Sequence, residues 1–98
     1  MRRLYLAGPI SGLDFNERRA TFAKKEITLR IVGWDVFNPF SLQPSPMEWK
    51  EALKLDIPEL LKCDALYLQR GWSKSEGCLL ERHIAEKLGI KVYYEAEV

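Results

Sequence analysis

The stretch DALYLQRGWSKSEGCLLERHIAEKLGIKVYY, residues 64–94, contains the pattern that decides the fold. Residues 64–69 form a short apolar run that is typical of a buried strand. Residues 75–88 carry apolar side chains at helical spacing, and Ser75 is suited to cap the helix. Residues 90–94 form a second apolar run. A strand, a helix and a strand in this order predict a parallel βαβ unit.

The earlier part of the chain repeats this alternation. Apolar runs that stop at Gly or Pro predict strands over residues 4–7 and 34–37. Apolar residues at helical spacing predict helices over residues 15–32 and 47–62, and Pro58 should kink or split the second helix. The order βαβαβαβ predicts an α/β fold, a Rossmann/flavodoxin-like three-layer sandwich. Its small parallel sheet should have about four strands, with helices on both faces.

Each predicted helix has one face on which apolar residues recur, and we expect these faces to pack against the sheet. They are formed by Ala20, Ala23, Ile27 and Ile31 in the first helix, by Trp49, Ala52, Leu53 and Leu60 in the second, and by Leu80, Ile84 and Leu88 in the third.

The composition is that of one globular domain spanning residues 1–98. Fifteen Lys and Arg against fourteen Asp and Glu leave a net charge of +1 without a basic run, which argues against a nucleic-acid polymer as partner. No segment has the length of a transmembrane helix or the pattern of a signal peptide, so we expect no membrane contact and a cytoplasmic location. Cys63 and Cys78 lack the spacing of metal ligands, and we expect reduced thiols, no metal and no cofactor.

The predicted strands end in three loops rich in Gly, Pro and Ser, namely residues 8–12, Asn38-Pro39 and residues 71–75. In open parallel sheets, ligands bind beyond the carboxyl ends of the strands. We therefore expect these loops to converge on one binding cleft.

Two acidic residues lie on the predicted apolar faces near this cleft. Asp56 lies one turn before Leu60, and Glu81 lies one turn after Gly77, which leaves space for a ligand to approach. Burial of a carboxylate raises its pKa or requires a partner, so two such acids suggest a paired-carboxylate site. In the alternative, structural interpretation, Glu81 pairs with a nearby cation or loop N–H, and Asp56 caps a new helical turn.

Several motifs occur in a characteristic order along nearly the whole chain. They are Tyr5-Leu6-Ala7-Gly8-Pro9, Phe15-Asn16, Asn38-Pro39, Asp56, Asp64, Gly71-Trp72 and Ser75-x-Gly77-x-x-x-Glu81-x-x-x-Ala85. Together they resemble the nucleoside 2-deoxyribosyltransferase-like superfamily, and most closely its short branch from phages and prophages. That superfamily includes transferases that move deoxyribose between bases, and N-glycosidases that hydrolyse deoxynucleoside 5'-monophosphates.

The resemblance implies roles in breaking an N-glycosidic bond. Glu81 matches the nucleophile that attacks the anomeric carbon, Asp56 the carboxylate that orients it or handles the proton of the base, and Tyr5 a tyrosine beside the nucleophile. A carboxylate can stabilise or capture the oxocarbenium-like centre, and a second acid can protonate the departing base. The predicted substrate-binding residues are Gly8, Pro9, Ile10, Ser11, Gly12, Asn38, Trp72, Ser75 and Gly77.

Ser75 bears on the choice between hydrolysis and transfer. In the resemblance, a serine at this place accompanies the monophosphate glycosidases and an acid accompanies the transferases. A helix N-terminus with Lys74 beside it suits a phosphate, although Ser75 could equally be only a cap. The glycosidases also carry an arginine in the first loop, where this chain has Ser11.

The sequence therefore predicts an N-glycosidase acting on a (deoxy)nucleoside 5'-monophosphate. A deoxyribosyltransferase and a non-catalytic nucleotide-binding module remain as alternatives. We also expect a homodimer or higher homo-oligomer, because four strands make a thin sheet, the chain has three Trp, and members of the superfamily complete their sites across an interface.

Overall fold

A single four-stranded sheet organises the structure, a computed structural model that describes residues 2–96. All neighbouring strands are parallel, and their order is β2-β1-β3-β4. The strands are β1 (Arg3–Ala7), β2 (Asp35–Phe37), β3 (Ala65–Leu68) and β4 (Lys91–Tyr94). The first strand lies near the centre, where Tyr5 pairs in register with Phe37 on one side and Leu66 on the other.

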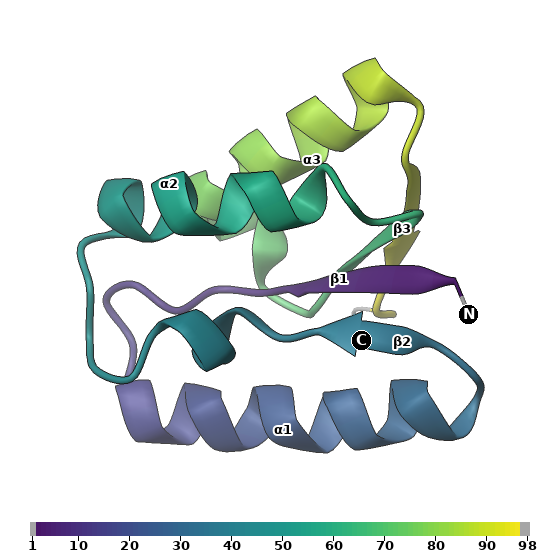
Figure 1. Ribbon diagram of the computed structural model, residues 1–98. Helices are drawn as coiled ribbons and strands as arrows, with labels where there is room; N and C mark the ends of the chain where they lie inside the picture. The colour runs from purple at the N-terminus through teal and green to yellow at the C-terminus, as the bar shows by residue number, and fades with distance from the viewer. Residues whose placement is uncertain (1, 97–98) are drawn as a thin grey trace.

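Three helices cover the sheet, one on one face and two on the other (Figure 1). They are α1 (Phe15–Ile31), α2 (Trp49–Leu60) and α3 (Glu76–Leu88), and two short 3-10 turns, η1 (Pro39–Leu42) and η2 (Trp72–Lys74), follow β2 and β3. The predicted α/β sandwich of the Rossmann/flavodoxin type is confirmed. Among the helices described between residues 2 and 96, none has the length and apolar character needed to cross a lipid bilayer.

Alternating side chains of β1 build a core on each face of the sheet. Tyr5 and Ala7 point to the α2 and α3 side, whereas Leu4 and Leu6 point to the α1 side, where Phe22 packs. This two-residue period is the ordinary geometry of a strand that is buried on both faces. It directs Tyr5 toward the two helices that carry the predicted acids.

The helix α2 continues through Pro58 to Leu60, so the predicted split does not occur. Pro58 lies in the last turn of the helix and is exposed. Asp56 lies inside the helix and is buried, so the alternative in which it caps a new turn is wrong.

The prediction of the buried face of α1 was wrong. Phe22 and Leu29 are buried against the sheet, while Ala20, Ile27 and Ile31 are exposed on the opposite side. The larger apolar residues at seven-residue spacing fill the space above the sheet, which the small Ala20 could not fill.

The apolar stripe predicted for α3 is correct only for Ile84, which is partly buried and packs against the core. The buried residues of this helix are Cys78, Glu81 and Ala85, whereas Leu80 and Leu88 are exposed. Glu81 therefore faces the core more directly than the leucines that the sequence pattern emphasised. The predicted helix ends are confirmed, because the Ser75 hydroxyl accepts a hydrogen bond from the N–H of Cys78 and Gly89 ends the helix in a left-handed conformation.

Candidate active site

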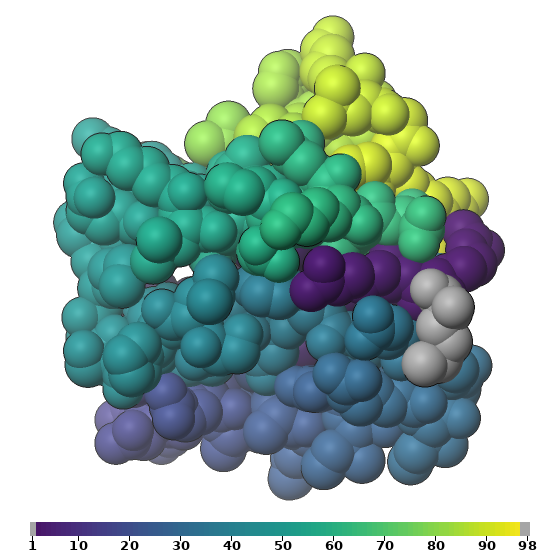
Figure 2. All heavy atoms as spheres, viewed as in Figure 1, coloured from purple at the N-terminus to yellow at the C-terminus, as the bar shows by residue number. Residues whose placement is uncertain are grey.

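A cavity of about 420 Å³ lies at the carboxyl ends of β1 and β3. The strand that follows β1 in the chain, β2, pairs with one edge of β1, and the next strand, β3, pairs with the other edge of β1. This divergence is the usual location of a ligand crevice in a parallel sheet. Figure 2 shows the surface hollowed between η1 and α2, where η1 residues and α2 residues form two of the cavity walls. The loop after β1 and the start of α3 form the others.

Three titratable side chains meet at the floor of this cavity. Tyr5 from β1, Asp56 from α2 and Glu81 from α3 all line it, and all three are buried. The Tyr5 hydroxyl donates a hydrogen bond to Oε2 of Glu81. The structure thus brings together all three residues that the resemblance placed in the catalytic group.

Burial dominates the acid–base properties of this group. Loss of solvation raises the pKa of Asp56 to about 7 and that of Glu81 to about 8, although hydrogen bonding to Tyr5 opposes both shifts. Burial, followed by the charges of Glu81 and Asp56, raises the pKa of Tyr5 well above its ordinary value. Tyr5 therefore keeps its proton at neutral pH, whereas Asp56 and Glu81 gain and lose protons near neutral pH.

The Tyr5 hydroxyl has one proton to donate, and it donates this proton to Glu81. Asp56 lines the same floor of the cavity, and hydrogen bonding with Tyr5 lowers its pKa, as it does for Glu81, against the larger effect of burial. Because the pKa values of Asp56, about 7, and of Glu81, about 8, both lie close to neutrality, the two carboxyls can hold one proton between them at neutral pH. Carboxyls with such pKa values can exchange protons with a bound ligand near neutral pH.

The start of α3 forms one end of the cavity. Ser75, Gly77 and Lys74 line it, and the Ser75 Oγ lies 3.3 Å from the N–H nitrogen of Cys78, from which it accepts. The capping role of Ser75 is therefore real, and its hydroxyl also borders the cavity. A Cβ added at Gly77 would meet nothing closer than 3.9 Å, so protein packing does not require the glycine.

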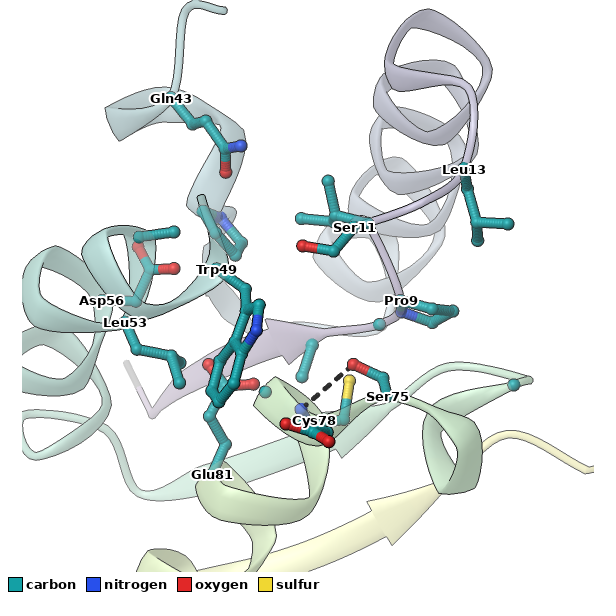
Figure 3. Close-up of a pocket in the computed structure, with 18 of the residues that line it drawn as sticks. Pro9, Ser11, Leu13, Gln43, Trp49, Leu53, Asp56, Ser75, Cys78 and Glu81 are labelled. Carbon is teal, nitrogen blue, oxygen red and sulfur yellow. Dashed lines mark hydrogen bonds between the residues drawn. The ribbon is translucent and has the colours of Figure 1, made fainter. Parts of the chain in front are cut away.

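The opposite wall contains two residues that the sequence reasoning did not select for the site, Gln43 and Trp49. Gln43 is only 4% exposed, and its amide points into the cavity from the end of η1 (Figure 3). Within residues 2–96, its backbone groups are hydrogen-bonded but its side-chain amide has no partner. An amide offers both donors and an acceptor, which suits the edge of a nucleobase. Because Gln43 lies in a Ser/Pro-rich loop segment, no periodic pattern marks it.

The loop after β1 forms a third wall through Pro9, Ile10 and Ser11. Gly8 is needed for the close approach of this loop to β3, because an added Cβ would lie 2.8 Å from Nε2 of Gln69. Arg18 holds the loop from behind, donating from Nε to the Pro9 carbonyl at 2.8 Å.

Three of the predicted substrate-binding residues do not line the cavity. Asn38 caps η1 by accepting from the N–H of Phe40 and donates its amide to Glu26. Trp72 packs against Tyr94, with ring centroids 5.2 Å apart, and so has a structural contact instead of a place in the cavity. Gly12 lies in the exposed turn beyond the cavity wall, with a positive φ of 79°.

Cys78 lines the cavity beside Glu81. Burial raises the pKa of its thiol to about 12, and the charge of Glu81 raises it further. The thiol therefore stays uncharged and is a poor nucleophile.

Comparison with known proteins gives one family match. Neither the search of curated proteins nor the search of solved structures found a match. Residues 2–94 match the model of a family that is described as a domain of unknown function, DUF4406. This match covers both the sheet and every wall of the cavity, and the chain therefore belongs to the DUF4406 family.

Proposed function

We propose that this protein hydrolyses the N-glycosidic bond of a (deoxy)nucleoside 5'-monophosphate. The observation that carries the proposal is the buried Asp56–Tyr5–Glu81 group at the floor of a cavity with largely apolar walls. Buried carboxyls with raised pKa values are typical of acid–base and nucleophilic sites. The resemblance of the sequence motifs to the nucleoside 2-deoxyribosyltransferase-like superfamily supports the same chemistry.

In the proposed reaction, the Glu81 carboxylate attacks the anomeric carbon of the sugar. The electrons of the breaking carbon–nitrogen bond pass to the base, which takes a proton from Asp56. Water then attacks the anomeric carbon, gives a proton back to Asp56 and releases Glu81. The products are the free base and the sugar phosphate, and the protein returns to its starting state.

The proposed orientation follows from the two ends of the cavity. The phosphate lies at the start of α3, where Ser75, Lys74 and the N–H groups of the first turn are available. The base lies toward Gln43, whose amide pairs with polar atoms of the base edge, and toward the apolar ring of Trp49. The sugar then lies over Glu81.

A nucleoside deoxyribosyltransferase is the second candidate. Among the described residues that line the cavity, Lys74 is the only cation, and the acidic Glu76 lies beside it. A phosphate would therefore meet little positive charge, which favours a substrate without one. In that case a second base replaces water as the acceptor of the sugar.

A panel of deoxynucleotides and matching nucleosides, read by chromatography for free base, tests the proposal. Hydrolysis is expected to release base and sugar phosphate in equal amounts without added acceptor. Turnover that requires a second base would identify the transferase. Nucleotides that stabilise the protein against heat but remain intact would instead identify a binding module and contradict both catalytic proposals.

A further inference from the structure

The free amide of Gln43 depends on the backbone of this residue for its position. The side chain is buried and aimed into the cavity (Figure 3), yet within residues 2–96 its amide binds no other group. The next residues give little support, because no hydrogen bond within the described chain holds residues 44–47, and Pro44 and Pro46 have no N–H to donate. The contacts that hold the amide in place must therefore lie at Gln43 itself or before it.

Arg19 of α1 holds the carbonyl of Gln43. The Arg19 Nη2 donates to this carbonyl at 3.1 Å, and the N–H of Gln43 donates to the carbonyl of Phe40, with 3.2 Å between nitrogen and oxygen. The peptide groups on both sides of the Gln43 Cα are thus held, which fixes the direction in which the side chain leaves the backbone. Loss of the contact with Arg19 would free one of these two peptide groups.

The guanidinium of Arg19 is itself held over two aromatic rings. Its Cζ lies 5.4 Å from the ring centre of Phe15, at the start of α1, and 5.6 Å from that of Phe40, in η1. The two rings pack against each other with their centroids 5.1 Å apart. A planar guanidinium can contact rings with its faces and donate hydrogen bonds from its edge. Arg19 therefore joins α1 to η1 through contacts that do not depend on Gln43.

The preceding residue makes a similar contact with another wall of the cavity. Arg18 donates to the carbonyl of Pro9, and both Pro9 and Gln43 line the cavity. Successive residues of a helix point about 100° apart, so adjacent arginines can reach two different loops. None of the described residues of α1 lines the cavity, yet two adjacent side chains of this helix support two of its walls.

We propose that Arg19 is a positioning residue, which acts through Gln43 and holds its amide toward the ligand in the cavity. That this ligand carries a nucleobase rests on the proposed function, whereas the placement of the amide by Arg19 does not. Because Arg19 acts only through Gln43, its loss cannot weaken binding more than loss of the amide does. It also should not affect the part of a ligand that lies at the other end of the cavity.

Nuclear magnetic resonance of the ligand-free protein tests the placement of the amide without an activity assay. The chain has two glutamines, so labelling of glutamine with ¹⁵N gives side-chain amide signals from Gln43 and Gln69 alone. The signal that is missing from Gln43→Leu belongs to Gln43. Gln69 is the internal reference, because it is 1% exposed and donates to the carbonyl of Ala7 at 3.2 Å.

Arg19→Met keeps an apolar side chain and removes the donor. The order parameter of the Gln43 amide should fall toward that of a freely rotating side chain, while that of Gln69 stays unchanged. Arg30→Met is the matched control, since Arg30 also lies on α1 and donates from Nη2 to a backbone carbonyl, that of Val36, at 2.8 Å. It removes the same charge and should leave both amides unchanged. An unchanged Gln43 amide in Arg19→Met would overturn the proposal.

A double-mutant cycle then tests whether Arg19 acts through Gln43. Arg19→Met should weaken the binding of nucleosides and nucleotides about threefold to tenfold, as expected for loss of an oriented hydrogen bond. In the Gln43→Leu background the same substitution should have no further effect. Binding of ribose 5-phosphate should be unchanged throughout, which separates positioning from a general attraction of the Arg19 charge for phosphate.

The two measurements fail independently. Equal losses from Arg19→Met in both backgrounds, or weaker binding of ribose 5-phosphate, would show that Arg19 does not act through Gln43 and would overturn the proposal. If no nucleoside or nucleotide binds the parent, the proposed function is wrong, and the order parameters alone then decide whether Arg19 positions the amide.

Discussion

The hydroxyl of Tyr5 donates its hydrogen bond to Glu81 across the floor of the cavity, joining the first strand of the chain to its last helix. Both side chains are buried, and neither would be expected in an apolar core without a partner. The hydrogen bond holds one oxygen of a carboxyl group that lines the cavity. The proposal that Glu81 acts as a nucleophile starts from this hydrogen bond.

Replacement of Glu81 by Gln is predicted to separate catalysis from stability. The amide keeps the shape of the side chain but cannot capture the developing cation, so base release should fall by a factor on the order of 10³ or more. Stability should stay level or rise, because a buried ionisable group is removed. Chromatography of free base and thermal unfolding on the same proteins measure both. Glu86→Gln, at an exposed position of α3, should change neither.

A purely structural role for Glu81 predicts the opposite effects of this substitution on stability and on base release. The Glu81→Gln variant would then melt at a lower temperature and release base at the parental rate, and that pair of results would end the nucleophile assignment. A 2-fluoro-2-deoxyarabinosyl substrate provides a direct check, because it should leave a sugar adduct on Glu81 that mass spectrometry detects.

The carboxyl pair predicts a stability that declines as pH rises through the neutral range. Burial raises the pKa of Asp56 from 3.8 to about 7 and that of Glu81 from 4.5 to about 8. Because the folded state then holds protons that the unfolded state has lost, each group contributes stability that is complete below its unfolded pKa and lost as pH rises through its folded pKa. The free energy of unfolding should fall by at most ~1.4 kcal/mol per pH unit for each proton involved.

Urea unfolding at a series of pH values measures this dependence. The double variant Asp56→Asn/Glu81→Gln should flatten the curve between acidic and neutral pH, while the Glu86→Gln control should follow the parent. A parent whose stability rises over the same range would contradict the raised pKa values.

The sequence predicted the architecture well because strand identity and order depend on local patterns. Short apolar runs that end at Gly or Pro marked β1 and β2, and the alternation with helices determined the parallel sheet. The cap at Ser75 and the end at Gly89 were similarly local. The buried Asp56–Tyr5–Glu81 group was found because Asp56 and Glu81 are exceptions to an apolar pattern, and the resemblance connected both of them to Tyr5.

The predictions that were wrong concern features that depend on packing between elements, which the sequence of a single helix does not determine. In α1, Ala20 and Ile27 give as good an apolar stripe as Phe22 and Leu29, and only the depth of the space above the sheet decides between them. Gln43 was missed because its burial follows from the path of a loop. Trp72 was assigned to the site from its place after β3, but its ring packs against Tyr94.

Recognition of a phosphate is predicted to depend on Ser75 and Lys74. Nucleoside 5'-monophosphates should raise the melting temperature more than the matching nucleosides, because charge-assisted hydrogen bonds to the start of α3 contribute ~1–3 kcal/mol. Lys74→Gln should remove most of that difference without affecting the binding of nucleosides. Equal shifts for both members of each pair would favour the transferase.

The amide of Gln43 is predicted to select among bases. Gln43→Leu keeps a similar volume but removes the donors and the acceptor, so affinity should fall by tenfold or more for bases that the amide contacts. The loss should differ between bases that present different donors and acceptors, and it should leave binding of ribose 5-phosphate unchanged. A uniform loss for all ligands would show that Gln43 only supports the wall.

Gly77 provides the final prediction, because the packing of the fold does not require the absence of a side chain there. A Cβ at this position would have no neighbour closer than 3.9 Å, and alanine is the better helix former, so Gly77→Ala should stabilise the protein by about 0.5 kcal/mol. The same methyl group would project toward the cavity one turn before Glu81, where it should hinder the approach of the sugar and reduce kcat/KM at least tenfold. Gly8→Ala is the matched control, since its Cβ would lie 2.8 Å from Nε2 of Gln69 and should destabilise the fold. Thermal unfolding and base release therefore move in opposite directions only for Gly77→Ala. If that variant is more stable and fully active, the open space beside Glu81 is not the path of the substrate.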